Sequence, residues 1–572
     1  MGGSLSRIGR APSSHANGRR TTPLACVVAF AMVASALTSC AGTTTANLPN
    51  LASPIYQPPT VAGLPAIQGP ISSPGGAFLH DQQGRVVFLH GVNAVYKLPP
   101  FELYPAPGKP WNFTAADASL MARLGFNVVR LGMTWKGLEP GTAPSNDPAI
   151  CTPGTPHDPG QFNLATLHRY LSNLAQTVQL LGRFHIYTLL DMHQDVFNEI
   201  FDGEGAPNWA VCTDGVPKTE APGRWSQNYG TAAAGAAYRH FWTNNVVGDL
   251  QGEYDRVWAA VAAYFHGDPW VVGYDPFNEP FSTSLVSSGD EQFDGQLECV
   301  YTGSALVGAP AHGAPAITCP QNVPRRGVIP QILAADPIHL IFYEPDIFGR
   351  RGSTNFVGAM NFPNLVFNVH VYCTQRSGKT GNPTNIAACS AQEGHSLQTR
   401  SEDRTDLASP AQPHGPAWFV SEFGATSNTA LLDVLTSEAD RALVGWTYWS
   451  WKYYGDPTGS AAEALVTANG QLRPTADVLA RTYPEAIAGR PISLSFDATN
   501  GAFHLVYVPD HGLRAPTVIF VPTRAHYPNG YCARASGGSV ISRPGSALLE
   551  VANASTGASV RVSVTSGICT GG

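Results

Sequence analysis

Short apolar runs alternate with amphipathic stretches between residues 75 and 488. Leucines recur every three or four positions at Leu164, Leu167, Leu171 and Leu174, which predicts a helix, and the same period predicts another over 254–265. Eight runs rich in β-branched and aromatic residues predict strands, over residues 86–93, 127–133, 185–192, 271–277, 338–343, 365–371, 417–423 and 443–449. Strands that alternate with helices favour a parallel sheet, so the pattern predicts an α/β fold with a (β/α)8 TIM barrel over 75–488.

The pattern changes after residue 488. Residues 492–496 and 503–508 alternate between apolar and polar positions on either side of Asn500-Gly501, and β-like runs follow at 517–521 and 558–564. Because no helical period is visible, residues 489–572 are predicted to form a C-terminal antiparallel β-sandwich domain. We expect this domain to pack against the barrel, and independent carbohydrate binding stays open as an alternative.

The first 40 residues have the organisation of a lipoprotein-type signal peptide. A basic stretch ending at Arg20 precedes an apolar run from Leu24 to Leu37, which is too short to span a bilayer comfortably. The next residues, Leu-Thr-Ser-Cys, resemble a bacterial lipobox and make Cys40 the expected lipidation site. Ordinary cleavage at a nearby small residue is the alternative. Residues 41–74 are rich in Thr, Ala and Pro, which predicts a flexible tether.

These features predict an exported protein, either secreted or held in the cell envelope at a membrane surface by its lipid anchor. Residues 1–39 hold four of the 34 basic residues and none of the 41 acidic ones, so the rest of the chain carries 30 − 41, or −11. This balance argues against nucleic acid as a partner, because phosphate neutralisation needs a basic surface. A monomer is expected.

Cysteine usage agrees with export. Apart from Cys26 and Cys40, the chain has an even number of cysteines, which in an exported protein predicts disulfides. Pairing in sequence order is the simplest arrangement, and it joins Cys151 to Cys212, Cys299 to Cys319, Cys373 to Cys389 and Cys532 to Cys569. Metal binding is the alternative, but no CxxC occurs and no ligand cluster has metal spacing.

Polar residues gather where the predicted barrel strands end, which is where TIM barrels build their active sites. The fourth strand leads into Asn278-Glu279 and the seventh into Glu422. Glycoside hydrolysis needs such a pair, because one carboxylic acid protonates the leaving oxygen while the other carboxylate attacks the anomeric carbon. Other strand ends supply candidates for binding the sugar or orienting the glutamates, namely Arg130, His193, Asp195, His370, Tyr372 and Trp449.

Each of these residues alone has an ordinary structural explanation. A glutamate after a strand is commonly a loop charge, Arg130 could form a structural ion pair, and Trp449 could belong to the core. Their order along the chain indicates a site, with Arg130 on the second strand, Glu279 on the fourth and Glu422 on the seventh. We expect Arg130 and Tyr372 to donate hydrogen bonds to Glu422 and to hold it ionised.

This order, together with GVNAVYK at 91–97, DMHQD at 191–195 and DPFNEP at 275–280, resembles glycoside hydrolase family 5 and its endoglycoceramidase branch. The resemblance implies a retaining enzyme with Glu279 as acid/base and Glu422 as nucleophile. It also implies that six residues contact the first sugar, namely Lys97, His193, Asp195, Asn278, Tyr372 and Trp449. The implied substrate is a glycolipid cleaved between glycan and ceramide, with no cofactor or metal.

Other functions stay open at this point. One is a family 5 β-glucosidase or glycanase that acts on glucosylceramide, a steryl glucoside or a polysaccharide. Another is a non-catalytic, glycan-binding surface lipoprotein, which the retention of both Glu279 and Glu422 disfavours. The long segment 281–337 is expected to shape the aglycone side, and the first long segment, 196–242, is expected beside the barrel mouth. The aromatic residues of the first suit either an apolar wall or packing around a disulfide.

Overall fold

The structure is a computed structural model that describes residues 66–141, 162–219, 225–244, 249–281, 291–304, 306–307, 317–319, 326–346, 357–373, 376–377, 382–383 and 385–569. The predicted signal, Cys40, residues 41–65 of the predicted tether and Cys151 lie outside the described residues. Among the residues it describes, no helix has the length and apolar character needed to cross a membrane.

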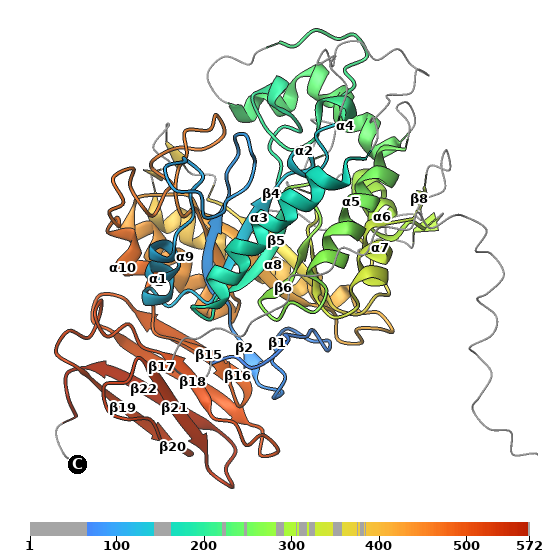
Figure 1. Ribbon diagram of the computed structural model, residues 1–572. Coiled ribbons are helices and arrows are strands. Elements are labelled where there is room, and N and C mark those ends of the chain that lie inside the picture. Colours follow the sequence, from blue (N-terminus) through green and yellow to red (C-terminus); the bar gives the residue numbers. More distant parts are fainter. Residues whose placement is uncertain are drawn as a thin grey trace, which may run out of the picture. The chain divides into compact units, whose positions relative to one another are not determined.

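Eight parallel strands close into the predicted barrel (Figure 1). In order around the barrel they are β3 (His90–Ala94), β4 (Val128–Met133), β5 (Tyr187–Met192), β6 (Val271–Asp275), β9 (Leu340–Tyr343), β10 (Leu365–Val371), β13 (Ala417–Gly424) and β14 (Trp446–Trp449). Each of the eight predicted segments therefore contributes one strand to the barrel. Every residue in them is buried, which explains why they appear in the sequence as continuous apolar runs.

The helices lie around these strands (Figure 1). They are α1 (Ala115–Arg123), α2 (Trp135–Leu138), α3 (Leu164–Gly182), α4 (Ala232–Thr243), α5 (Leu250–Phe265), α6 (Glu291–Thr302), α7 (Val328–Ala335), α8 (Ile386–Asp406), α9 (Thr429–Ala442) and α10 (Thr475–Leu479). Short 3-10 turns η1 (Glu199–Phe201), η2 (Asn208–Ala210) and η3 (Trp225–Gly230) lie before α4. The two predicted helices are α3 and α5. Each begins at a side-chain cap, Asn163 for α3 and Asp249 for α5, which accepts a backbone N–H of the first turn.

Two antiparallel sheets form the C-terminal β-sandwich. The first has the order β1 (Leu79–His80), β2 (Val86–Val87), β15 (Tyr483–Ile487), β18 (Thr517–Phe520), β21 (Leu548–Asn553) and β20 (Gly538–Val540). The second has the order β16 (Gly489–Asp497), β17 (Ala502–Pro509), β22 (Val560–Ser566) and β19 (Tyr531–Ser536). Buried side chains of both sheets, such as Ile519 and Leu505, share one core. Two further short hairpins are β7 (Leu306–Val307) with β8 (Ile317–Thr318), and β11 (Arg376–Ser377) with β12 (Asn382–Pro383).

The boundaries of these parts differ from the predicted ones. The predicted strand 86–93 divides into β2, which pairs with β15 of the sandwich, and β3, which belongs to the barrel. The sandwich therefore also takes residues from before the barrel and from before position 489. Apolar periodicity cannot reveal this, because the whole run is buried: Val86 and Phe88 lie in the sandwich core, and Val87, Leu89 and Val92 lie in the barrel core.

The end of the predicted tether is also part of the fold. Ile67 and Ile71 are buried in the barrel's hydrophobic core, and the Ser73 hydroxyl donates to the Leu365 carbonyl over 2.9 Å. The two isoleucines stand among Pro, Gly and Ser residues, so no helical or strand period marks them. The flexible-tether prediction is therefore wrong for residues 66–74.

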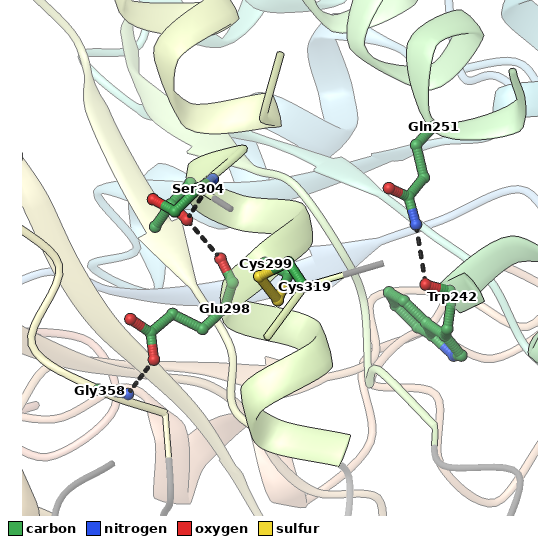
Figure 2. The surroundings of a disulfide bond; sticks show 8 residues. Trp242, Gln251, Glu298, Cys299, Ser304, Cys319 and Gly358 are labelled. Atoms are coloured by element: carbon green, nitrogen blue, oxygen red, sulfur yellow. Dashed lines mark hydrogen bonds between the residues drawn. A yellow bond between two sulfur atoms is a disulfide. The ribbon is translucent and has the colours of Figure 1, made fainter. Parts of the chain in front are cut away.

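Three predicted disulfides are present, Cys299–Cys319, Cys373–Cys389 and Cys532–Cys569. Cys212 is also disulfide-bonded, and its predicted partner Cys151 lies outside the described residues. Figure 2 shows the disulfide that joins Cys299 of α6 to Cys319, close to a hydrogen bond between α6 and Gly358. There the Glu298 carboxylate accepts the Gly358 backbone N–H over 3.1 Å, and burial raises the pKa of Glu298 to about 7.

Candidate active site

The carboxyl ends of β6 and β13 bring the two predicted catalytic glutamates together. Glu279 follows β6 with a left-handed φ of 43°, and its backbone N–H donates to Glu344 Oε2 over 3.0 Å. Glu422 lies within β13. One oxygen of each of the two carboxylates and one ring nitrogen of His370 all lie within 4.8 Å of one another. The three side chains are almost completely buried.

Arg130 is the central cation of the site and is wholly buried. Its guanidinium donates to Glu422 Oε1 over 2.7 Å, and it donates to Asp191 and Asp275 over 2.9 Å. A further hydrogen bond of 3.2 Å reaches Glu344. Because buried carboxylates need a charged or polar partner, this one side chain holds together residues from the ends of four strands besides its own.

Glu422 is surrounded by donors, as predicted. Tyr372 donates its hydroxyl proton to Oε2 over 2.8 Å, opposite the bond from Arg130 to Oε1. Burial raises the pKa of Glu422 to about 7, against the lowering effects of His370 and Arg130. The predicted donors orient the carboxylate. The expectation that they hold it ionised is met only in part, because burial brings the pKa of Glu422 close to neutral pH.

His370 lies between the acids. Its Nδ1 is 3.0 Å from Glu279 Oε1 and 3.4 Å from Glu422 Oε2, and its Nε2 is 3.0 Å from Glu344 Oε1. Burial opposes the imidazolium form, but Glu344 and Glu422 outweigh this effect and raise the pKa of His370 well above its usual value. His370 therefore supplies a second positive charge between the two glutamates.

A second polar cluster lies on the β5 side of the barrel mouth. The Lys97 ammonium forms an ion pair with Asp195 Oδ2 and lies 4.6 Å from the centre of the Trp449 ring. Burial disfavours the charge on Lys97, but Asp195 and Glu204 raise its pKa overall. Trp449 is stacked against His193, with 5.3 Å between ring centres and 12° between planes. These side chains form the wall expected to bind the first sugar.

The neutral form of His193 leaves one acceptor for a ligand. Its Nδ1 lies 2.8 Å from Asp191 Oδ2, so Nδ1 carries the proton and Nε2 has its lone pair free. Nε2 is buried and has no hydrogen-bond partner among the residues described. Burial and the nearby Lys97 lower the pKa of His193 well below its usual value. A sugar hydroxyl could donate to this nitrogen.

Asn278 is fixed by its neighbours. Its side-chain oxygen accepts from Arg130 over 2.8 Å, and its amide donates to the Gln194 carbonyl over 2.9 Å. The second amide hydrogen is available for a sugar hydroxyl. Gln194 in turn donates to the carbonyls of Asn278 and Glu279, so it holds the segment that carries the predicted acid/base.

The predicted catalytic and sugar-binding residues thus all lie in one site. One part of the site surrounds Glu279 and Glu422, and the other is the polar cluster around Lys97. The sequence prediction missed several buried polar partners, namely Asn93, Asp275, Glu204, Glu344 and Asn368. The signal for Glu344 was present, because it directly follows the predicted strand 338–343, as Glu279 follows its own strand. Glu204 had no such signal, because it lies in a long loop.

The aromatic residues of the segment 196–242 pack inward. Phe197, Phe201, Trp209 and Phe241 are buried, and Trp225 packs against the same core. Phe197 and Phe241, together with neighbouring aromatic rings, line a cavity of about 40 Å³ beside His193 and Asn278. Of the two explanations for these residues, the described part of the segment supports internal packing.

In the part of the chain that the structure describes, three groups of side chains have enough ligand atoms for a metal ion. The first, Cys212 with Asp214 and His240, contains a disulfide-bonded sulfur. The second, His193 with Asp195 and Glu204, already holds the Lys97 ammonium. The third, Glu279 with His370 and Glu422, adjoins the Arg130 guanidinium. A protein cation in contact with a donor set repels a metal cation, so the last two groups suit hydrogen bonding to a polar ligand better.

Comparisons with known proteins agree with this geometry. Residues 98–455 match the family described as Cellulase (glycosyl hydrolase family 5), and residues 481–564 match the Glycoside hydrolase family 5 C-terminal domain. The chain is 28% identical to Endoglycoceramidase I of Rhodococcus hoagii (strain 103S) over 493 residues, and the alignment covers 83% of this chain and 84% of that protein. It is 27% identical over 489 residues to an Endoglycoceramidase of Hydra vulgaris, with 80% and 82% covered. The solved structure of Endo-glycoceramidase II from Rhodococcus sp. superposes with a TM-score of 0.65 and 24% identity, covering 86% of this chain and 100% of that one.

Proposed function

Since the chain belongs to glycoside hydrolase family 5, we propose that it is a retaining β-glycosidase that cleaves glycolipids between the glycan and the ceramide. The observation that carries the proposal is the close approach of Glu279, His370 and Glu422, with interatomic distances within 4.8 Å. Retaining enzymes hold their two carboxyl groups about 5–5.5 Å apart, whereas inverting enzymes leave about 6.5–9.5 Å for a water molecule.

In the first step, Glu279 gives its proton to the glycosidic oxygen as the bond from that oxygen to the anomeric carbon breaks. The Glu422 carboxylate attacks the same carbon, and a covalent glycosyl-enzyme forms. In the second step, Glu279 removes a proton from water, which attacks the anomeric carbon and releases Glu422. The bonds from Arg130 and Tyr372 suit Glu422 to the role of nucleophile, because both favour its ionised form.

Glycolipid specificity rests on the relatives. Two curated proteins similar over more than three quarters of their length are named endoglycoceramidases. The polar cluster of Lys97, His193, Asp195 and Trp449 supports a glycone-binding site on the β5 side. The amide of Asn278 supports a contact to the sugar 2-hydroxyl, which strengthens in the transition state.

Product analysis tests the substrate. Residues 41–572 are incubated with lactosylceramide, with glucosylceramide and with a soluble β-glucan. Intact disaccharide with free ceramide is the expected result. Cleavage of glucosylceramide alone would limit the glycone site to one sugar, and cleavage of the glucan alone would contradict the glycolipid assignment. Inverted configuration in the first product would contradict the two-step mechanism.

Paired variants test the roles of the two acids. Glu422→Gln should abolish turnover and form no covalent intermediate. Glu279→Ala should retain more activity on an activated aryl β-glycoside than on a lipid glycoside, because that leaving group needs little protonation, and azide should accelerate it. Absence of azide rescue in Glu279→Ala, with rescue in Glu422→Ala instead, would reverse the assignment. Glu438→Gln, on α9 and paired with Arg441, is a control that should match the wild type.

We further propose that the chain is exported as a monomeric lipoprotein, with lipid on Cys40 that holds the enzyme at a membrane surface. The Leu-Thr-Ser-Cys sequence and the three disulfides support export. A bacterial host given an alkyne-labelled fatty acid should label the wild type and not Cys40→Ala. Light scattering of residues 41–572 should give the mass of one chain, and a dimer mass would contradict the monomer.

A further inference from the structure

Glu204 and Asp195 form a pair of acids in the wall of the glycone pocket. Their backbones make an isolated antiparallel bridge, in which Asp195 N donates to Glu204 O over 3.0 Å and Glu204 N donates to Asp195 O over 2.8 Å. Directly opposed residues of such a bridge place their side chains next to each other. A carboxylate oxygen of each acid lies within 4.8 Å of the other and of a ring nitrogen of His193.

This pair has too little positive charge around it for both acids to ionise. Lys97 contacts Asp195 and lies 3.4 Å from Glu204 Oε1. Asp456 adds a third acid to the electrostatic surroundings of the same ammonium. Two buried carboxylates at short range cannot both keep a charge, so one of them takes up a proton.

The hydrogen bonds show which acid is the better base for that proton. Asp195 accepts from Lys97 at short range and from the Tyr229 hydroxyl over 3.4 Å. Glu204 is wholly buried, its Oε2 receives only a long 3.4 Å contact from Thr458, and its Oε1, although 3.4 Å from the Lys97 ammonium, accepts no hydrogen bond from the described residues. When Glu204 is protonated, its carboxyl O–H can donate a hydrogen bond, and the adjacent Asp195 carboxylate is the acceptor.

We propose that Glu204 is a positioning residue of the glycone pocket, which in its protonated form donates a hydrogen bond to Asp195 and so keeps Asp195 and Lys97 directed at the first sugar. This inference rests on the proposed function of the site, because the sugar is the ligand that Asp195 and Lys97 hold. Ionisation of Glu204 would place a second negative charge beside Asp195 and draw Lys97 away from the sugar.

The titratable groups that face Glu204 keep their charge states between neutral and alkaline pH, so Glu204 is the group expected to change its charge. Burial raises the pKa of Glu204 well above its usual value, with Lys97 opposing and with Asp195 and Asp456 adding to the rise. On β5 and the loop after it, His193 stays neutral because burial lowers its pKa. On η3, Tyr229 stays protonated because burial raises its pKa. The pKa of Lys97 is also raised, so its charge persists at alkaline pH.

Glu204→Gln is the test, because glutamine has the shape and the donor of the neutral acid but cannot ionise. Kinetics are measured on an aryl β-lactoside across neutral to alkaline pH. The wild-type KM should rise about tenfold per pH unit once Glu204 ionises, while the KM of Glu204→Gln stays within about twofold of its neutral value. Glu199→Gln is the matched control, since Glu199 lies five positions earlier and forms a partly exposed ion pair with Lys136; it should follow the wild type.

Thermal and denaturant unfolding give a readout that does not depend on turnover. A carboxyl group with a raised pKa in the folded state binds a proton that the unfolded chain releases, so wild-type stability falls as pH rises above the unfolded pKa. The folding constant of Glu204→Gln relative to the wild type should grow by up to about tenfold per pH unit above pH ~4.5, and that of Glu199→Gln should not.

Three results would overturn the proposal. One is a Glu204→Gln variant with a neutral-pH KM raised tenfold or more, which would show that the ionised acid is needed. Another is a relative stability that does not change with pH. The third is dependence of the wild type on an added divalent cation, which would assign His193, Asp195 and Glu204 to a metal. If no β-glycoside is cleaved but the stability difference follows pH as expected, the protonated pair stands and the proposed function fails.

Discussion

Removal of one hydroxyl group should shift the pH dependence of the whole reaction. Tyr372 donates to Glu422 Oε2 over 2.8 Å, and this bond favours the carboxylate over the acid. The change Tyr372→Phe deletes the donor and keeps the ring, which packs against Val95, Ala425 and Trp449. A hydrogen bond to a charged group contributes about 1.5–3 kcal/mol, which corresponds to about one to two pKa units.

The direction of the pKa shift follows from the protonation state of Glu422 that the hydrogen bond stabilises. Loss of a donor to the ionised form raises the pKa of Glu422, from about 7 to roughly 8–9. Only the carboxylate attacks the anomeric carbon, so kcat/KM declines as pH falls through this pKa. The acid limb of the profile should therefore move to higher pH in Tyr372→Phe, while its alkaline limb stays where it is in the wild type.

The assay is kcat/KM against pH with an activated aryl β-glycoside, whose leaving group makes the protonation state of Glu279 less important. Tyr483→Phe is the control, because it removes a buried hydroxyl that donates to the Gly125 carbonyl over 2.7 Å, outside the active site. A uniform loss of activity in Tyr372→Phe with an unmoved acid limb would refute the reasoning, since it would mean that Tyr372 acts on substrate binding and not on the charge of Glu422.

Three further changes test the contacts described above. Arg130→Lys keeps the positive charge but has fewer hydrogen-bond donors. Loss of two charge-assisted hydrogen bonds should lower kcat/KM by about a hundredfold or more. A fall of under tenfold would contradict the central role of Arg130. Burial lowers the pKa of His90, so the wild type loses stability as pH falls below 6.5. In denaturant titrations, the unfolding free energy of His90→Phe relative to the wild type should therefore be about 2 kcal/mol higher at pH ~5 than at pH ~8. A difference that does not change with pH would contradict this. Replacement of Cys373 and Cys389 by Ser should cost about 3 kcal/mol of unfolding free energy, and a reductant should then lower the Tm of the wild type more than that of the variant.

His90 illustrates how a residue of the barrel can take part in the sandwich. Its ring is stacked between Trp446 of β14 and Tyr483 of β15, with ring centres 4.3 Å and 3.9 Å away. Both ring nitrogens are buried without a hydrogen-bond partner in the part of the chain that the structure describes. Protonation in this position would bury an unpaired charge, which gives the acid-pH prediction its physical basis.

The barrel and both glutamates could be predicted from the sequence because their signals are local. A buried strand appears as an apolar run, and the residue at its carboxyl end necessarily faces the mouth of a TIM barrel. Glu279 and Glu422 each follow or end such a run, and Arg130 lies in one. The cysteine pairs were predictable for a similar reason, since each of the three observed bridges joins neighbours in the cysteine order.

The charge state and the partners of the site were decided only by tertiary structure. Glu204 meets Asp195 and Lys97 because a loop folds back and forms one antiparallel bridge, and no periodicity records such a contact. The same is true of β2, whose pairing with β15 joins residues almost 400 positions apart. Hydrophobic pattern depends on whether a side chain is buried, whereas a pKa depends on which charges lie within a few ångströms, and that is determined only when distant segments come together.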